Sequence, residues 1–204
     1  MTTWFTADLH LGHQNIIRYC DRPFADVDAM NRALIDRWNE VVGDDDVVWV
    51  LGDFALGRIA DTLPLAGALR GRKVLLAGNH DRCWHGHGRR VDEWTDRYLD
   101  AGFDEIVQGT ATMSVAGETV RLCHFPYRGD SHGTDRYLDH RPTDLGDWLL
   151  HGHVHERWVQ HGRMINVGVD ARGFRPMSEP EVAAIIHAGP TIRTPPEDDG
   201  PGGG

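Results

Sequence analysis

Short runs of hydrophobic residues recur along the chain, and each run ends where Gly, Asp, Asn or His begins. The runs are rich in Val, Leu and aromatic residues, a composition that is typical of buried β-strands when turn-forming residues follow. They cover residues 4–7, 47–51, 74–77, 120–123 and 148–150. The pattern therefore predicts a series of short, buried strands.

Between the first two runs, the hydrophobic positions instead follow a helical period. Met30, Leu34 and Trp38 recur every four residues, which predicts an amphipathic helix. Two later segments have a similar character, although Pro64 limits the length of the first and Gly102 closes the second. The expected helices cover residues 28–42, 59–69 and 91–101.

The second half of the chain is richer in strand patterns than the first. Residues 113–123 are typical of a hairpin around Ala116 and Gly117, and a further strand is expected over 164–169. Strands separated by helices, followed by a strand-rich half, favour packed sheets with helices outside. Periodicity alone thus predicts an α/β domain.

The domain organisation is simple. A chain of 204 residues is long enough for one domain with a substantial core, and we expect that domain to cover 1–193. Residues 194–204 are rich in Pro and Gly and contain no hydrophobic side chain other than proline. This composition predicts a disordered tail.

Charge and cysteine content restrict the function classes. The formal net charge of −10 argues against stable binding of duplex nucleic acid, which relies on dense Lys and Arg. Nucleotides remain compatible, because a metal pair can hold phosphate. Three cysteines without a C-x-x-C motif, no export signal and no long apolar span predict a cytoplasmic protein without a membrane segment. The sequence sets no oligomeric state.

Each of the five hydrophobic runs leads into residues that can bind a metal ion. Ligands placed where strands give way to loops are held by a rigid sheet while they face an open cleft. In chain order, these residues are Asp8, His10, Asp53, Asn79, His80, Asp81, His124, His153 and His155. His151 also follows the last run, but we interpret it as a residue at the end of a strand rather than as a ligand.

These residues form the motifs D-x-H, G-D, G-N-H-D, H and G-H-x-H, in this order, from Asp8 to His155. The ordered set spans about three quarters of the chain and resembles the calcineurin-like metallophosphoesterase superfamily. The resemblance implies a four-layer α/β/β/α sandwich of two mixed β-sheets with flanking helices. It also implies a binuclear-metal-dependent phosphoesterase that acts on a small phosphorylated substrate.

The resemblance further implies a ligand set for two divalent metal ions. One ion is assigned Asp8, His10 and His155, the other Asn79, His124 and His153, and Asp53 bridges the two. The chemistry agrees, since a carboxylate can give one oxygen to each ion and imidazole suits borderline transition metals. Manganese is expected, and iron, zinc, nickel and cobalt also fit these ligand types.

His80 and Asp81 are assigned other roles. The resemblance places His80 off the metals and facing the substrate, where it can donate a proton to a departing alkoxide. Asp81 is expected to orient a ligand. The implied mechanism is in-line attack on phosphorus by a metal-bridging hydroxide, which metal binding makes available near neutral pH.

Several polar residues lie close in sequence to these motifs. His13 and Arg128 are candidate substrate-binding residues, because both follow a ligand motif and a guanidinium can bind phosphate through paired hydrogen bonds. For His85, His87 and Arg89 a solvated loop is the favoured interpretation. The polar stretch 129–142 either covers the cleft as a specificity loop or is a surface excursion, and the sequence leaves both open.

The motifs favour phosphodiesters over phosphoproteins. The protein-phosphatase branch carries a longer G-D-x-x-D-R-G element, which is missing after Asp53, and lipid-precursor hydrolases carry G-N-R-D where this chain has His80. Cyclic nucleotides and small nucleotide-type substrates are therefore expected. The alternatives are a phosphomonoesterase or nucleotidase, and a non-catalytic scaffold of the same fold. A structural zinc domain is disfavoured, because the candidate ligands include no clustered cysteines.

Overall fold

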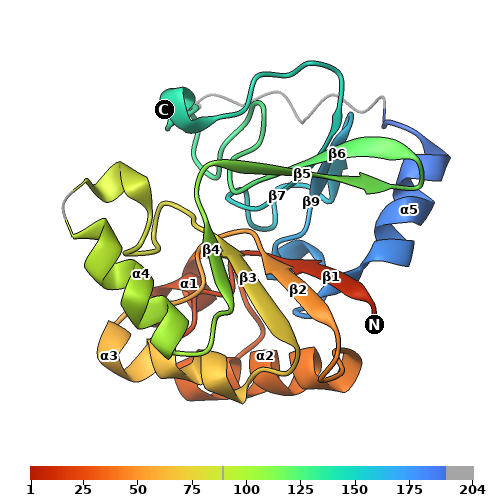
Figure 1. Cartoon of the computed structure of the whole chain (residues 1–204). Helices are drawn as coiled ribbons and strands as arrows, with labels where there is room; N and C mark the ends of the chain where they lie inside the picture. The colour runs from red at the N-terminus through yellow and green to blue at the C-terminus, as the bar shows by residue number, and fades with distance from the viewer. Residues whose placement is uncertain (89, 192–204) are drawn as a thin grey trace, which may run out of the picture.

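Two mixed β-sheets form the centre of the protein, and the computed structural model describes residues 1–88 and 90–191 (Figure 1). The first sheet has the order β10-β1-β2-β3-β4, with strands Met177–Ser178, Thr3–Thr6, Val47–Val50, Arg72–Leu76 and Glu105–Val107. The second has the order β5-β6-β7-β9-β8, with strands Thr110–Val115, Glu118–Cys123, Trp148–His151, Met164–Asn166 and Gln160–His161. The tail predicted over 194–204 lies outside the described residues.

Strand direction determines where the loops gather. β1 pairs in parallel with β2, and β2 in parallel with β3, so the carboxyl ends of all three strands share one edge of the first sheet. β6 pairs in parallel with β7, which places their carboxyl ends together in the second sheet. The loops that leave these five strands therefore form two groups.

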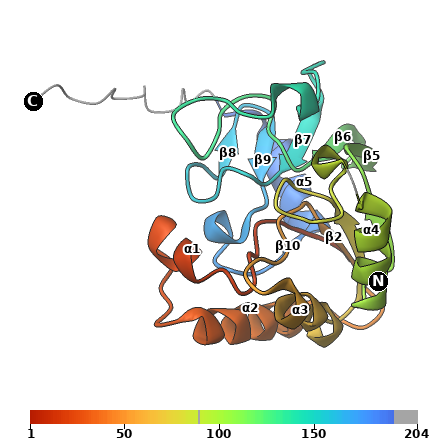
Figure 2. The same cartoon turned by 90° about the vertical axis from the view of Figure 1, so that its left-hand side faces the viewer.

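Helices flank the sheets (Figures 1 and 2). The α-helices are α1 (Gln14–Tyr19), α2 (Val27–Val41), α3 (Ile59–Thr62), α4 (Val91–Asp100) and α5 (Glu179–Ala188). The 3₁₀ helices are η1 (Leu63–Ala68), η2 (His85–His87), η3 (Leu138–His140) and η4 (Val169–Ala171). In both views, α2 and α3 cover the first sheet on the side away from the second sheet, whereas α5 lies beside β1, β5 and β10.

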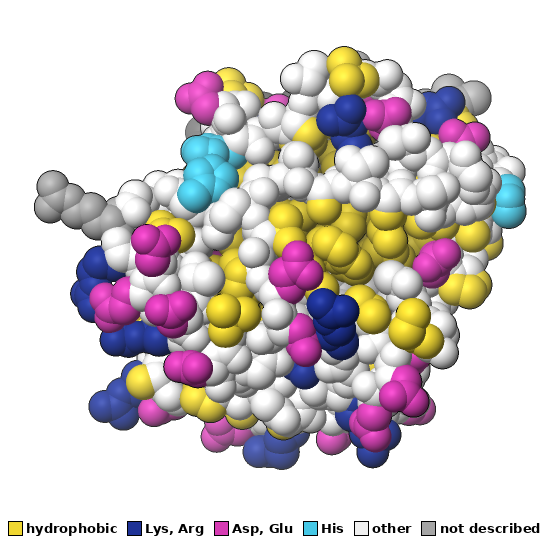
Figure 3. Space-filling model, in the orientation of Figure 1, with side chains coloured by type: hydrophobic (Ala, Val, Ile, Leu, Met, Phe, Trp, Pro, Cys, Tyr) yellow, Lys and Arg dark blue, Asp and Glu magenta, His cyan; other side chains and the backbone are white. Residues whose placement is uncertain are grey.

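The core has two parts. Side chains alternate between the two faces of the first sheet along β2 and the residue that follows it. Val48 and Val50 therefore pack in a cluster with α2, whereas Leu51 packs in a cluster with the second sheet. Trp49 and Met113 are only partly buried against that second cluster. Figure 3 shows hydrophobic side chains reaching the surface in the middle of one face, with acidic and basic side chains interspersed around them.

The predicted architecture of two mixed sheets with flanking helices is confirmed. The helices expected over 28–42 and 91–101 correspond to α2 and α4. The helix expected over 59–69 is divided into α3 and the 3₁₀ helix η1, because Pro64 has no N–H group for an α-helical hydrogen bond. No helix in the described part of the chain is long and apolar enough to span a membrane.

Candidate metal centre

The candidate ligands lie in the loops that follow β1, β2, β3, β6 and β7, and these loops meet where the two sheets adjoin. The first sheet supplies Asp53, whose Oδ2 lies 3.6 Å from Nε2 of His10 and 3.5 Å from Nε2 of His124 of the second sheet. Oδ2 of Asp8 accepts a hydrogen bond of 2.9 Å from the backbone N–H of His153. Residues separated by more than a hundred positions in sequence thus form one buried cluster.

Several of these residues adopt the left-handed backbone conformation, which sets the direction of their side chains. Five candidate ligands have positive φ angles between 51° and 72°, and they are Asp8, His10, Asp53, His153 and His155. The left-handed conformation costs roughly 1–2 kcal/mol for a residue with a side chain. Such strain concentrates at functional sites, where the surrounding structure holds it. The positive φ angles of these five residues favour a functional site over ordinary turns at the ends of strands.

Two glycines allow the backbone to approach the buried carboxylates. A Cβ atom on Gly78 would lie 2.5 Å from Oδ1 of Asp53, and one on Gly152 would lie 2.7 Å from Oδ2 of Asp8. Any side chain at either position would therefore displace a carboxylate. This explains on steric grounds why Gly precedes Asn79 in one motif and His153 in the other.

The first group of ligand atoms comes from Asp8, His10 and His155, and these atoms lie within 4.8 Å of one another. Oδ1 of Asp8 and both ring nitrogens of His10 are buried without a hydrogen-bond partner in the described structure. Buried polar atoms are almost always paired, so this group fits a bound cation. Burial raises the pKa of Asp8 to about 6 and, with the nearby His155, holds the pKa of His10 well below its usual value. A neutral imidazole is the form of histidine that binds metals.

A second group surrounds His124. The Nδ1–H of this ring donates to the carbonyl of Leu51 at 2.8 Å, because a carbonyl can only accept, which leaves Nε2 to face the other candidate ligands. Nε2 lies 3.0 Å from Oδ1 of Asn79 and 3.5 Å from Oδ2 of Asp53. This arrangement of an imidazole nitrogen, an amide oxygen and a carboxylate oxygen also fits a bound cation.

Asp53 lies between the two groups. Burial opposes its charge, but the nearby His124 and His80 rings lower the pKa of this carboxyl below its usual value. Asp53 also joins Asp8 and His124 in a set of ligand atoms within 4.8 Å of one another. Asp53 thus contacts both groups, and its bridging role stays a prediction.

His153 is held by a residue that the sequence did not identify as part of the site. Its Nε2 lies 3.0 Å from Oδ2 of Asp130, and His153 belongs to none of the groups of closely spaced Asp, His and Cys ligand atoms among the described residues. Asp130 is buried and also receives hydrogen bonds from Arg136 at 2.7 Å and Arg141 at 3.1 Å. Burial lowers the pKa of His153 to about 4, so the ring is neutral near pH 7. The only signal in the sequence was the place of Asp130 in the polar 129–142 stretch.

His155 has a carboxylate partner of its own. Its Nδ1 lies 3.3 Å from Oδ2 of Asp170, and Arg22 forms a buried ion pair of 2.7 Å with the same carboxyl. Arg22 also donates to the backbone carbonyls of Asp8 and Leu9, so one guanidinium ties the first ligand motif to Asp170. Burial opposes a charge on His155, but its bonds to Asp170 and Cys20 raise its pKa well above the usual value. Neither Arg22 nor Asp170 carries a motif signal.

Asp81 lies beneath the site and connects the loops after β2 and β3. Its carboxylate accepts from the backbone N–H groups of Asp53 at 2.8 Å, Phe54 at 3.0 Å and Gly78 at 2.9 Å. Burial, followed by the charge of Asp53, raises the pKa of Asp81 to about 6. This position is compatible with the orienting role predicted for Asp81.

A cavity of about 560 Å³ opens above the cluster. His10, Asp53, His153 and His155 contribute to its floor or walls, together with His13, His80 and Arg136. The side chain of His80 is exposed to this space, while its backbone N–H donates to Oδ1 of Asp53 at 2.8 Å. His80 therefore contacts the site through its backbone and faces the cavity with its ring.

The remaining candidates separate into two kinds. His13 lines the cavity, with its ring 5.4 Å from that of His10. Arg128 does not line it; its guanidinium lies 3.9 Å from Asp144, and Arg136 supplies the guanidinium of the cavity instead. His151 is fully buried in β7, with Nδ1 2.7 Å from the carbonyl of Gly152, and it is absent from the groups of possible metal ligands among the described residues.

Fold and site together define an α/β protein with a buried group of Asp and His residues, at the ends of its strands, that could hold a metal ion. The chain is 36% identical over 200 residues to the gene 66 protein of Mycobacterium phage L5, covering 91% of this chain and 94% of that protein. It is 38% identical over 189 residues to the gene 66 protein of Mycobacterium phage D29, covering 86% and 92%. The chain belongs to the family of these gene 66 proteins.

No protein-family model matches the chain. A solved structure of a protein of unknown function from Aquifex aeolicus is similar over 90% of this chain and 98% of its own, with a TM-score of 0.68 and 27% identity. The fold is therefore found beyond the phage relatives.

Proposed function

We propose that this protein is a phosphoesterase that uses two divalent metal ions to hydrolyse phosphodiester bonds in small, nucleotide-type substrates. The observation that carries the proposal is the set of buried, unpartnered ligand atoms on Asp8 and His10, next to Asp53 and beneath an open cavity. The ordered motifs, with their resemblance to calcineurin-like metallophosphoesterases, supply the reaction class.

The residues present fit a pair of ions. Asp8, His10 and His155 would hold one, Asn79, His124 and His153 the other, and Asp53 would touch both. Such ions would act as Lewis acids on the phosphoryl group and would make the attacking water more acidic. Asp130 and Asp170 would fix the orientation of the two ligand histidines of the last motif.

The chain's own contribution to bond cleavage falls to His80. Its ring faces the cavity, and burial, although opposed by Asp53, lowers its pKa below the usual value of histidine. In its protonated form, this ring could give a proton to a departing alkoxide, which makes His80 the candidate proton donor. The backbone bond to Asp53 keeps this residue beside the candidate bridging ligand.

The charges of the cavity favour a diester over a monoester. Besides the histidines, its lining carries one guanidinium, that of Arg136, and the carboxyl groups of Asp53 and Glu156. Arg136 is already paired with Asp130 at 2.7 Å, so no unpaired guanidinium lines this cavity within the described residues. A phosphodiester carries one negative charge and a phosphomonoester nearly two near neutral pH. The second candidate, a phosphomonoesterase or nucleotidase, would have to balance the additional charge of its substrate with the metal ions alone.

The test is hydrolysis of bis-p-nitrophenyl phosphate and p-nitrophenyl phosphate by protein that has been stripped of metal and reloaded with manganese. We expect the diester to be cleaved faster, and Asp53→Asn to lose both metal and turnover. Faster monoester cleavage would support the nucleotidase alternative. No turnover by protein shown to have bound metal would support the non-catalytic scaffold.

A further inference from the structure

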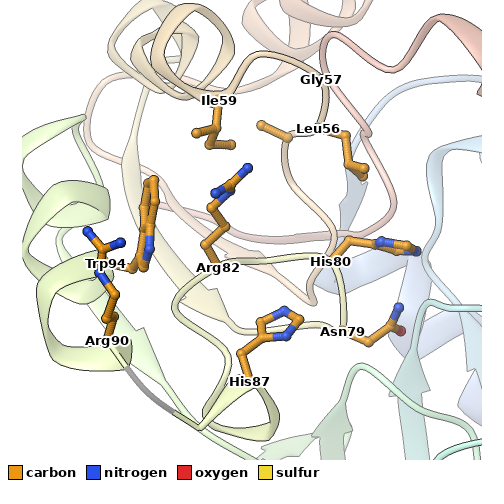
Figure 4. A pocket seen from close by; sticks show the side chains of 10 residues that line it. Leu56, Gly57, Ile59, Asn79, His80, Arg82, His87, Arg90 and Trp94 are labelled. Carbon is orange, nitrogen blue, oxygen red and sulfur yellow. The ribbon is translucent and has the colours of Figure 1, made fainter.

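A second pocket of about 370 Å³ adjoins the metal centre (Figure 4). It shares Leu56, Asn79 and His80 with the neighbourhood of the centre and extends from there toward α4. In Figure 4 the side chains of Asn79 and His80 point away from the middle of the pocket. The remaining wall includes Ile59, Arg82, His87, Arg90 and Trp94. The two spaces therefore lie on either side of the motif that contains His80.

Arg82 is the unpaired cation of this pocket. Its guanidinium lies 4.9 Å from the centre of the Trp94 ring, and it has no ion pair with any carboxylate in residues 1–88 and 90–191. Arg90, by contrast, binds Glu93 through two hydrogen bonds of 2.7 and 2.8 Å. In Figure 4 the Arg82 side chain rises between Trp94 and Leu56 toward Ile59. In a chain with a formal net charge of −10, an unpaired guanidinium on an aromatic ring favours an anionic ligand.

The position of this pocket relative to His80 indicates which part of a substrate would reach it. A proton donor lies next to the oxygen that leaves, so the leaving group extends from the phosphorus past His80. The pocket with Arg82 shares Leu56 and His80 with the cavity above the metal centre, so a leaving group beside His80 could extend over Leu56 into it. Its walls offer Leu56, Ile59 and Trp94 to an apolar or planar group, in addition to the cation.

We propose that this pocket binds the leaving group of the substrate and that Arg82 binds a second phosphate carried by that leaving group. The substrate class is a linear phosphodiester of nucleotide type with a phosphate on the released nucleoside; this inference rests on the proposed function. A guanidinium offers two parallel N–H donors to a phosphate, and an aromatic ring on one face holds it in place. A cyclic nucleotide carries no second phosphate and would leave Arg82 unused.

The test compares three thymidine dinucleotides: one without a terminal phosphate, one with a 5′-phosphate and one with a 3′-phosphate. Product analysis identifies which nucleoside is released with a free hydroxyl. We expect a phosphate on that nucleoside to raise kcat/KM about tenfold, and a phosphate on the other one to have little effect. Arg82→Met should abolish this preference. Arg97→Met is the matched control, because Arg97 also lies on Trp94, at 4.6 Å, but does not line the pocket.

A binding measurement separates the subsite from turnover. Isothermal titration of the metal-free protein with thymidine 3′,5′-bisphosphate should give an affinity that Arg82→Met weakens about tenfold and Arg97→Met leaves unchanged. Equal kcat/KM for all three dinucleotides, or an equal loss of affinity in both variants, would overturn the assignment of Arg82. Failure of the proposed function is a different result, namely no hydrolysis of bis-p-nitrophenyl phosphate by the metal-loaded native protein.

Discussion

At the scale of single residues, the side chain of His80 can be removed without removing a candidate ligand. Its link to Asp53 runs through the backbone N–H, which survives substitution. His80→Ala should therefore retain bound metal and lose about 10²–10⁴-fold in turnover on substrates with alkoxide leaving groups. Bis-p-nitrophenyl phosphate should lose less, since its leaving group needs no proton. Metal analysis and kinetics on both substrates check this, and loss of metal by the variant would show that the proton-donor role is wrong.

A substitution of Asp170 tests whether metal affinity depends on the orientation of a ligand as well as on the ligand itself. It binds Nδ1 of His155 and pairs with Arg22, but belongs to no motif. We expect Asp170→Asn to weaken metal affinity roughly 10–100-fold. Asp147→Asn is a suitable control, because it breaks an Arg121 ion pair of the same 2.7 Å length in another part of the second sheet. Equal metal affinities of the two variants, measured by titration calorimetry, would contradict the role of Asp170.

The motifs name the candidate ligands and Asp81 but not Asp130 or Asp170, for a physical reason. A motif such as G-H-x-H is local, because the strand-to-loop geometry fixes where each side chain points. The bond from His153 to Asp130 depends on how a distant loop folds back, as does the bond from His155 to Asp170. No spacing in the chain encodes those contacts.

At the scale of elements, the 129–142 loop depends on one buried carboxylate. Asp130 receives hydrogen bonds from His153, Arg136 and Arg141, and so ties the loop to the metal centre. This contact favours the covering loop over the surface excursion. Asp130→Ala should make the loop more sensitive to limited proteolysis and should weaken metal binding. Asp135→Ala, which removes a bond of 3.1 Å to Gly129 in the same loop, should leave metal affinity unchanged, and a matching loss in both variants would count against the anchor.

The last helix, α5, begins with a capping box that gives its stability a pH dependence. Although burial opposes its charge, hydrogen bonds from Arg175 and Ser178 lower the pKa of Glu181 from 4.5 to about 2. A lowered carboxyl pKa stabilises the folded state above pH 4.5, and this stabilisation is lost as the pH falls toward 2. Glu181→Gln should therefore cost about 1 kcal/mol at pH 7 and less at pH 3.5. Urea unfolding measures this, and Glu179→Gln in the same turn should show a smaller effect.

The longer helices and strands could be predicted because their hydrophobic periods are long enough to recognise. α2 repeats its buried positions over Val27–Val41, and the hairpin turn at Ala116 and Gly117 lies where expected, with φ angles of 53° and 80°. β4, β8 and β10 are two or three residues long, too short to show a period of two. α5 buries Val182 and Ile186 in a segment that is apolar on most sides, so its pattern does not distinguish helix from strand.

The whole molecule is organised around the junction of its two sheets. The first sheet brings Asp8 and Asp53 to this junction, and the second brings His124 and His153. Periodicity predicts only an α/β domain, whereas the two mixed sheets were implied by the resemblance of the motifs to a known superfamily. A bound metal pair would contact both sheets and should therefore stabilise the molecule as a whole.

Metal binding, pH and thermal stability should therefore be linked in this protein. Without metal, burial holds the pKa of Asp8 at about 6, so an ionised Asp8 destabilises the folded state at neutral pH. Metal relieves this cost, whereas protons compete with metal below about pH 6. Manganese at 100 times its Kd adds about 2.7 kcal/mol, which corresponds to a rise in Tm of roughly 5–10 °C for a chain of this size.

We expect this rise in Tm at pH 7.5, a clearly smaller rise at pH 5.5, and none in Asp53→Asn, because the bridging carboxylate contacts both ligand groups. Differential scanning calorimetry with manganese and with EDTA provides the measurement. Calcium at the same concentration is the control, since imidazole-rich sites bind it poorly. An equal rise at both pH values, or one that survives in Asp53→Asn, would mean that the ion binds elsewhere on this acidic surface and that the cluster around Asp53 is not the metal centre.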